Sequence, residues 1–216
     1  MNAIGATALA SACRLGRLEC AEALIDKCDP RAKDYSGQDA LMAAAESDGF
    51  ECLKLALARC DPREFDRFGG SALMRASRSG NASAVELLLQ KSNPRQVDSQ
   101  GATALILAAA SGSAQCVRLL LEASDLAAED KLGRTAMIAA LHHAQEDLAI
   151  EIASWMKWAR AGRLDARAMH AAKALGRKAF LRHVDAMEVA ETEWNALNGA
   201  CERGLREWAD GSARRL

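Results

Sequence analysis

A glycine recurs at a fixed interval along most of this chain, and other residue types recur in phase with it. The glycines are Gly5, Gly37, Gly69, Gly101 and Gly133, each 32 positions after the one before. An apolar residue follows each glycine by four positions: Leu9, Leu41, Leu73, Leu105 and Met137. An aspartate precedes four of the glycines by three positions: Asp34, Asp66, Asp98 and Asp130. A repeat of this length is typical of a solenoid, in which units stack because none can bury its apolar face alone.

One period predicts a turn, a short inner helix, a second helix antiparallel to it, and a return loop. In residues 34–66 the turn is DYSG, whose glycine suits a positive φ. The inner helix is ALMAAAES, rich in small side chains, and the second helix is FECLKLALAR, with apolar residues at helical spacing. Good N-cap residues stand two positions after each glycine: Thr7, Asp39, Ser71, Thr103 and Thr135. We expect the inner helix to end at Gly16, Gly80 and Gly112, and one position late at Gly49.

These positions together resemble the ankyrin repeat, whose pattern runs D-x-x-G-x-T-P-L-H-x-A-A-x-x-G. Residues 98–112 read DSQGATALILAAASG, and paired leucines follow at 119–121. Two features depart from the family: alanine replaces the proline at Ala8, Ala40, Ala72, Ala104 and Ala136, and the turn before the aspartate is one residue shorter. The resemblance implies an all-α solenoid of helix-turn-helix repeats joined by β-turn or hairpin loops. It also implies that another protein binds along the concave face.

We expect seven units in one continuous domain. Five are clear, at about 1–33, 34–65, 66–97, 98–129 and 130–158. Residues 159–216 fit two degenerate units, one with its inner helix near 168–176 and one near 196–204, and we expect the last to be a C-terminal cap.

The resemblance also places a binding surface on the turn tips and the exposed side of the inner helices. The candidates are Tyr35, Ser36, Gln38, Glu46, Arg67, Phe68, Arg78, Gln100, Lys131, Arg134, His142 and His143. The same positions include Ser47, Ser79, Ser99, Ser111, Ala102, Ala110 and Leu132. Phe68 is the sharpest case, because a phenylalanine beside a turn glycine has little structural reason to be there. It either packs on the neighbouring turn or anchors a partner, together with Tyr35.

A second candidate surface lies toward the C-terminus. All 4 tryptophans occur after residue 154, and they either fill irregular packing or form a docking surface. Residues 157–182 carry eight basic side chains against one acid, Asp165, which predicts either a solvated face or attraction for an acidic partner. The secondary candidates are Trp155, Trp158, Lys173 and Arg177.

Composition narrows the class of function. The net charge of −1 disfavours nucleic acid, and no apolar run is long enough for a membrane span. The N-terminus lacks the basic region of a signal peptide, and the 7 cysteines are spaced too far apart for disulfides, so we expect a reducing, cytoplasmic location, with delivery into a host cell left open.

No catalytic, phosphate-binding or metal-binding motif occurs, so we expect no enzyme activity and no cofactor. The sequence predicts a monomeric scaffold, adaptor or inhibitor that binds a protein partner. Two alternatives remain open: a C-terminal effector segment at 155–216 carried by a targeting arm, and a basic patch that binds nucleic acid.

Overall fold

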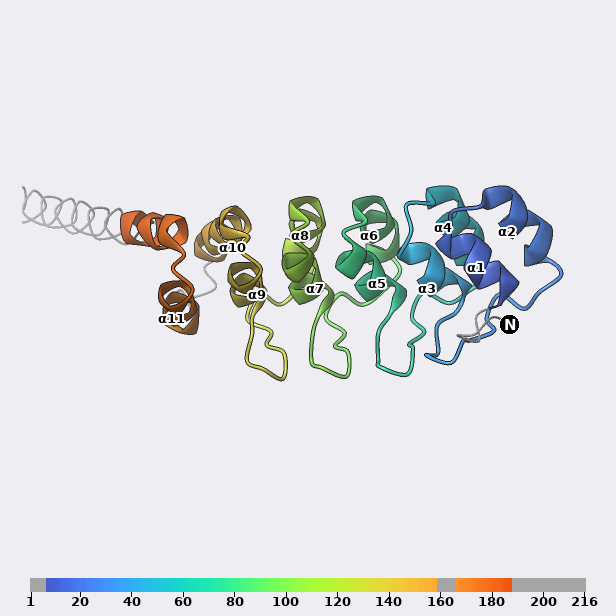
Figure 1. Cartoon of the computed structure of the whole chain (residues 1–216), viewed down its shortest axis with the longest axis horizontal. Coiled ribbons are helices and arrows are strands. Elements are labelled where there is room, and N and C mark those ends of the chain that lie inside the picture. Colours follow the sequence, from blue (N-terminus) through green and yellow to red (C-terminus); the bar gives the residue numbers. More distant parts are fainter. Residues whose placement is uncertain (1–6, 159–165, 188–216) are drawn as a thin grey trace, which may run out of the picture.

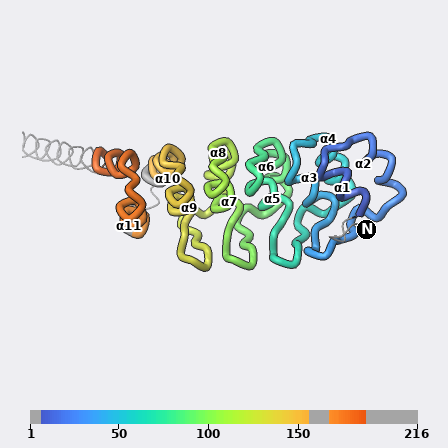
Figure 2. Tube along the Cα trace, in the orientation of Figure 1, coloured from blue at the N-terminus to red at the C-terminus, as the bar shows by residue number. Residues whose placement is uncertain are grey.

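Short helices stack in a row to form an all-α solenoid, which confirms the predicted fold class (Figure 1). The computed structural model describes residues 7–158 and 166–187. The inner helices are α1 (Ala8–Arg14), α3 (Ala40–Ala45), α5 (Ala72–Ser79), α7 (Ala104–Ser111) and α9 (Ala136–His142). The outer helices are α2 (Leu18–Ile25), α4 (Phe50–Leu57), α6 (Ala82–Leu89), α8 (Ala114–Leu121) and α10 (Glu146–Trp158). We number these five helix pairs as units 1 to 5. The loop before each inner helix of units 3 to 5 projects from the same side of the stack (Figure 2).

The last described part of the chain continues the helical arrangement. Helix α11 (Ala166–Ala174) packs against α9, and residues 178–187 are helical, with Phe180 fully buried. The predicted seventh unit and the linker between α10 and α11, residues 159–165, lie outside the described residues. None of the helices in the described ranges has the length and hydrophobicity that crossing a membrane requires.

Each inner helix begins at the N-cap residue that the sequence predicts. The Asp39 Oδ1 atom accepts a hydrogen bond from Met42 N at 2.8 Å, and Thr7 Oγ1 accepts one from Ala10 N at 3.1 Å. The hydroxyls of Ser71, Thr103 and Thr135 accept equivalent bonds. Each bond satisfies a backbone N–H that has no partner inside the helix, so the helix start is fixed by local chemistry.

The predicted glycine stops are confirmed in three units and wrong in one. Gly16, Gly80 and Gly112 adopt positive φ values of 64°, 75° and 79°. Gly49 instead has a φ of −76° and is the N-cap of α4, four residues after α3 has ended at Ala45. A glycine is needed at Gly49 because neighbouring units approach closely there: a Cβ atom would lie 2.7 Å from Gly16 Cα.

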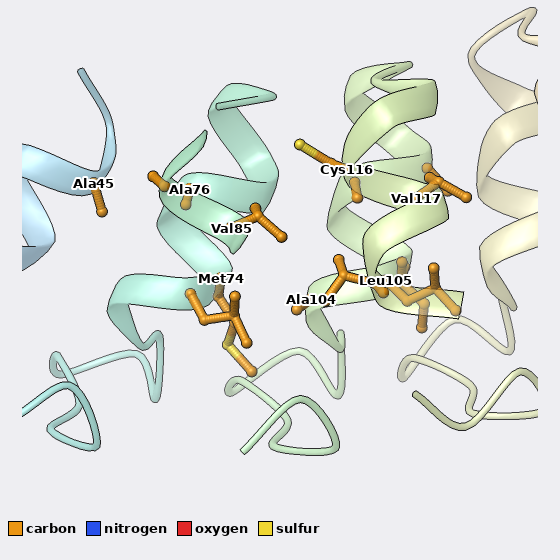
Figure 3. Packing of buried hydrophobic residues seen from close by; sticks show 14 of the residues in the cluster. Ala45, Met74, Ala76, Val85, Ala104, Leu105, Cys116 and Val117 are labelled. Carbon is orange, nitrogen blue, oxygen red and sulfur yellow. The ribbon is translucent and has the colours of Figure 1, made fainter. Parts of the chain in front are cut away.

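Small side chains on the inner helices let neighbouring units approach and form one continuous core. Every residue of α3 is buried, and α5 packs directly against α3 and α7. The recurring apolar residues Leu9, Leu41, Leu73, Leu105 and Met137 are at most 1% exposed. Figure 3 shows Leu105 beneath Val117, with alanines filling the space between helices. The repeat period therefore reflects a repeated packing layer.

The six cysteines among the described residues are all free thiols. Burial, with a smaller contribution from nearby Cys52, raises the pKa of Cys13 to about 11. Cys20 is exposed although it shares a repeat position with buried Cys52 and Cys116. Cys116 points toward the preceding unit (Figure 3), and in the described structure no unit precedes α2 to cover Cys20. The thiol at this repeat position is therefore buried in units 2 and 4 and exposed in unit 1.

Candidate binding surface

A row of identical turns forms one edge of the candidate surface. In unit 3, Asp66 Oδ1 accepts hydrogen bonds from Phe68 N and Gly70 N, both at 2.8 Å. Asp34, Asp98 and Asp130 make the same pair of bonds in their own turns. Each aspartate therefore satisfies two backbone donors and fixes the turn that presents the neighbouring side chains.

Backbone hydrogen bonds join each turn to the next. Arg67 N donates to Ser36 O at 2.9 Å, and Ser99 N donates to Phe68 O at 2.7 Å. Lys131 N repeats this contact with Gln100 O at 2.8 Å. Gly37 is required in this row, because its φ is +85° and a Cβ atom would lie 2.8 Å from Arg67 N. The turn tips of units 2 to 5 are thus held in register as one strip.

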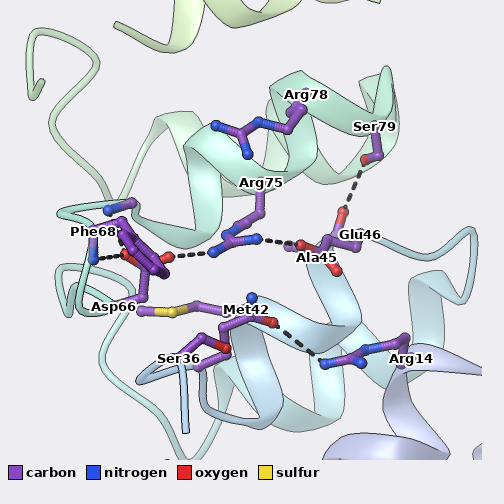
Figure 4. Close-up of polar contacts among 12 residues, drawn as sticks. Arg14, Ser36, Met42, Ala45, Glu46, Asp66, Phe68, Arg75, Arg78 and Ser79 are labelled. Carbon is purple, nitrogen blue, oxygen red and sulfur yellow. Dashed lines mark hydrogen bonds and ion pairs between the residues drawn. The ribbon is translucent and has the colours of Figure 1, made fainter. Parts of the chain in front are cut away.

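Arg75 connects the turns to the inner helices. Its guanidinium donates to Asp66 in its own unit and to Glu46 Oε1, at 2.8 Å, in unit 2 (Figure 4). Burial alone would lower the pKa of Arg75, but its hydrogen bonds and ion pairs with Asp66 and Glu46 raise it above the usual range. Gln38 lies in the same cluster, since its amide oxygen can accept from Arg75 at 2.9 Å or, in the other amide orientation, from Arg14 at 3.3 Å.

Two of the turn aspartates, Asp34 and Asp130, are stabilised in their ionised form. Burial alone would raise the pKa of Asp34, yet the backbone N–H groups of Gln38 and Ser36, the Ser36 hydroxyl and the Arg14 charge lower it below the usual value. Asp130 follows the same logic: burial opposes ionisation, but backbone bonds from Arg134 and Leu132 and the Arg134 guanidinium lower its pKa. The negative charge of these two carboxylates is therefore balanced by donors within the turns and by nearby arginines.

A pocket of about 200 Å³ lies between units 3 and 4, at the angle between the turns and the inner helices. Its lining includes Phe68 and Gln100 from the turns, Met74, Arg75 and Arg78 from α5, and Leu107 from α7. The pocket therefore combines apolar walls with two guanidinium groups and the carboxylates of Asp66 and Asp98. We call the turn tips 34–37, 66–69, 98–101 and 130–133, with the exposed side of the inner helices, the inner face.

Most predicted surface residues are accessible on this face. Tyr35 is 65% exposed and Phe68 is 58% exposed, so Phe68 does not bury its ring on the neighbouring turn. Arg67, Arg78, Gln100, Lys131, His142 and His143 are exposed, while Ser36 and Arg134 are half-buried. Leu132, at the repeat position of Phe68, is 76% exposed. The structure brings Phe68, Arg78 and Gln100 together in the pocket.

Several predicted residues serve the stack itself. Gln38 is buried, so its side chain does not form exposed surface, and Glu46 is held by Arg75. The hydroxyls of Ser47, Ser79 and Ser111 donate to carbonyls of the preceding inner helix, at Cys13, Ala45 and Ser77. These side chains join units because the last carbonyls of a helix lack partners within it.

The secondary C-terminal candidates show a similar mixture. Trp155 is half-buried against the core, Lys173 is exposed, and Arg177 Nε donates to Leu141 O at 2.9 Å. Trp158 ends α10, and its side chain lies outside what the structure describes. Two described basic residues of this stretch are thus already engaged, since Arg167 also pairs with Glu129.

Two further arrangements bear on the question of chemistry. Ser154 Oγ lies 3.4 Å from His183 Nε2, but the hydroxyl also bonds Ile150 O at 2.9 Å, as helix serines commonly do. Within the described ranges, no three His, Cys, Asp or Glu side chains are grouped closely enough to hold a metal ion.

Sequence reasoning missed Arg75 as the residue that organises the face. A signal was present: the equivalent positions in units 2, 4 and 5 are Ala43, Leu107 and Ala139, so an arginine there stands out. Its ion-pair partners lie in two different units, and the repeat pattern does not predict contacts between side chains of different units.

Comparison with protein families agrees with this architecture. A family model described as ankyrin repeats in three copies matches residues 1–66 and 73–159. The chain belongs to the ankyrin repeat family. Ankyrin repeats are generally protein–protein interaction modules. A search of curated proteins finds no match.

In unit 2 the structure explains one departure from the ankyrin repeat pattern. Alanine replaces the usual proline at the first position of each inner helix, and in unit 2 Ala40 N donates to Pro30 O at 3.3 Å. A proline has no N–H for this bond. Ala40 is also buried, so a small residue fits the space.

Proposed function

We propose that this protein binds a segment of another protein along its inner face, with the pocket between units 3 and 4 at the centre of the contact. The observation that carries the proposal is Phe68, a large apolar side chain left exposed at the rim of a pocket that the turns and helices hold rigid. An exposed aromatic beside a preformed pocket is typical of an interface anchor.

The geometry supports a scaffold, adaptor or inhibitor rather than an enzyme. Hydrogen bonds within and between the turns hold the surface in place before a partner arrives, so binding loses little conformational entropy. We infer no catalysis, because the residues that line the pocket include no nucleophile paired with a base.

Capture of partners from a lysate of the source organism tests this proposal. We expect wild type to recover a protein that the triple variant Tyr35→Ala, Phe68→Ala, Arg78→Ala loses. All three side chains are exposed, so the variant should keep the circular dichroism spectrum and melting temperature of wild type.

A matched control changes exposed residues away from the inner face. The variant Arg59→Ala, Glu86→Ala, Glu122→Ala alters the ends and surface of outer helices, and it should recover the partner as wild type does. Loss of the partner by this control, with retention by the inner-face variant, would place the binding surface elsewhere and reject the proposal.

A further inference from the structure

We infer that the inner face recognises an acidic segment of its partner, in which a carboxylate stands close to an apolar side chain. This rests on the proposed function and names the chemistry of the partner. It begins from the charges that the fold leaves available on the inner face.

The acids of the turns and inner helices are already engaged. The four turn aspartates each accept two backbone N–H bonds, and Asp39 caps α3. Glu46, the remaining acid on these elements among units 2 to 5, is paired with Arg75. Asp48 is exposed but follows α3 at the edge of unit 2, so the charge that stays accessible on the inner face of units 3 to 5 is cationic.

Three cations of these units remain accessible. Arg67 and Lys131 are exposed turn residues, and no carboxylate of the described ranges lies within ion-pair distance of them. Arg78 is 59% exposed, and its Nη2 atom forms an ion pair with Asp98 Oδ2 at 3.8 Å, which is too long for a hydrogen bond. A planar guanidinium with free donors suits a carboxylate from a partner.

Apolar groups stand beside these cations. Phe68 follows Arg67 in the same turn, and Leu132 follows Lys131 in the turn of unit 5. Arg78 shares the pocket with Phe68, Met74 and Leu107. A partner that places an apolar side chain in the pocket therefore brings its neighbouring residues next to a guanidinium, and an acid there gains a charge-assisted bond.

A protein segment fits this arrangement better than nucleic acid does. The large apolar groups alternate with single cations, and a phosphate backbone would leave Leu132 and Phe68 without apolar partners. Nucleic acid is instead favoured by a continuous cationic groove with several stacking aromatics.

A peptide library panned on the full chain tests the inference. We expect random 12-residue peptides selected by wild type to be acidic, with Asp or Glu within a few positions of Leu, Ile, Phe or Trp. For the strongest peptide, Arg78→Ala should weaken binding about tenfold in fluorescence anisotropy, and Arg78→Glu should weaken it further. Replacing the peptide's critical acid by Lys should restore binding to Arg78→Glu. The control Arg59→Glu, on the end of an outer helix, should leave the affinity unchanged.

The possible outcomes separate this inference from the proposed function. Neutral or basic peptides that lose binding in Phe68→Ala would reject the acidic specificity but keep the inner face as the binding surface. Peptides that Phe68→Ala and Arg78→Glu leave unaffected would reject both. A library that enriches nothing, or a 12-nucleotide single-stranded DNA that displaces the peptide at equal concentration, would also overturn the inference.

Discussion

The inner face and the outer helices both carry arginines and carboxylates, but these residues have different roles on the two surfaces. On the outer helices, cations and acids pair across units in the open: Arg59 with Asp26 at 3.0 Å, and Arg118 with Glu151. On the inner face, the carboxylates are buried among backbone N–H groups, and Arg75 is 14% exposed between two acids. The outer ion pairs leave no excess of positive or negative charge. On the inner face, by contrast, the turn aspartates bind backbone N–H groups, and several cations stay accessible.

This difference shows that net charge says little about a surface. The whole chain carries a formal charge of −1, which disfavours anionic partners on average. Yet the turns take up four aspartates for structural purposes, and what remains exposed beside the pocket is positive. The location of the acidic residues, and whether they are already hydrogen-bonded, therefore matters more for binding than their number.

The largest difference between the two faces should appear on removing an arginine. Arg75→Ala leaves the fully buried Asp66 carboxylate without its guanidinium, and we expect it to lower the free energy of unfolding by about 3 kcal/mol, as breaking a buried ion pair does. Urea denaturation followed by circular dichroism measures the change.

The matched outer variant is Arg59→Ala, whose ion pair with Asp26 is exposed on both sides. We expect a loss below about 1 kcal/mol, because solvent screens such pairs. Equal losses in the two variants would show that Arg75 is not the link between units 2 and 3 that the structure indicates.

The turns offer a second, smaller contrast. Asp130 accepts hydrogen bonds from Leu132 N and Arg134 N and pairs with the Arg134 guanidinium, while exposed Asp125, in the turn after α8, accepts one bond from Ala127 N at 3.0 Å. Asp130→Ala leaves two backbone donors unsatisfied, and we expect a loss of about 2 kcal/mol, against about 0.5 kcal/mol for Asp125→Ala. Thermal and urea denaturation of both variants measures the two losses of stability.

The contribution of Asp130 to stability should also decrease as the pH falls. Its folded pKa is depressed, so its stabilising effect is fully present above the unfolded pKa of about 3.9 and is lost as pH falls through the folded value. The difference between wild type and Asp130→Ala should therefore hold from neutral pH to about pH 5 and shrink in acid. A difference that grows in acid would contradict the assigned charge state.

The sequence predicted the features that depend on neighbours along the chain. The turn aspartates, the N-caps and three of the four glycine stops are local, so a 32-residue period revealed them. The fold class followed, because a stack is the arrangement that buries every repeated apolar position at once. Gly49 was misread because its reason lies in another unit, at the backbone of Gly16.

The candidate surface was predictable only in outline. Exposure of Tyr35 and Phe68 follows from their place at turn tips, and two of the predicted surface residues, Phe68 and Arg78, line the pocket. The burial of Gln38 was not predictable, because it depends on Arg14 and Arg75 approaching from adjacent units. Contacts between side chains of different units carry no periodic signal when only one unit contains them.

The last expected effect is a gain in stability, at the junction between the inner face and the outer helices. At this junction Gly16, Gly80, Gly112 and Gly176 have positive φ, and Ala144 takes the same position in unit 5 with a φ of 63°. A left-handed conformation costs a residue with a Cβ atom about 1–2 kcal/mol. We therefore expect Ala144→Gly to stabilise the protein by about 1 kcal/mol, visible as a higher melting temperature. The gain is smaller than the full strain energy, because glycine has more conformational entropy than alanine in the unfolded chain. The reverse change, Gly112→Ala, should destabilise by a similar amount, because Gly112 has a φ of 79°, while the nearby Gln145 amide can move away from the new Cβ atom. If Ala144→Gly instead lowered the melting temperature, the junction of unit 5 would not share the geometry of the others, and the inner face would lose its regular spacing at His142 and His143.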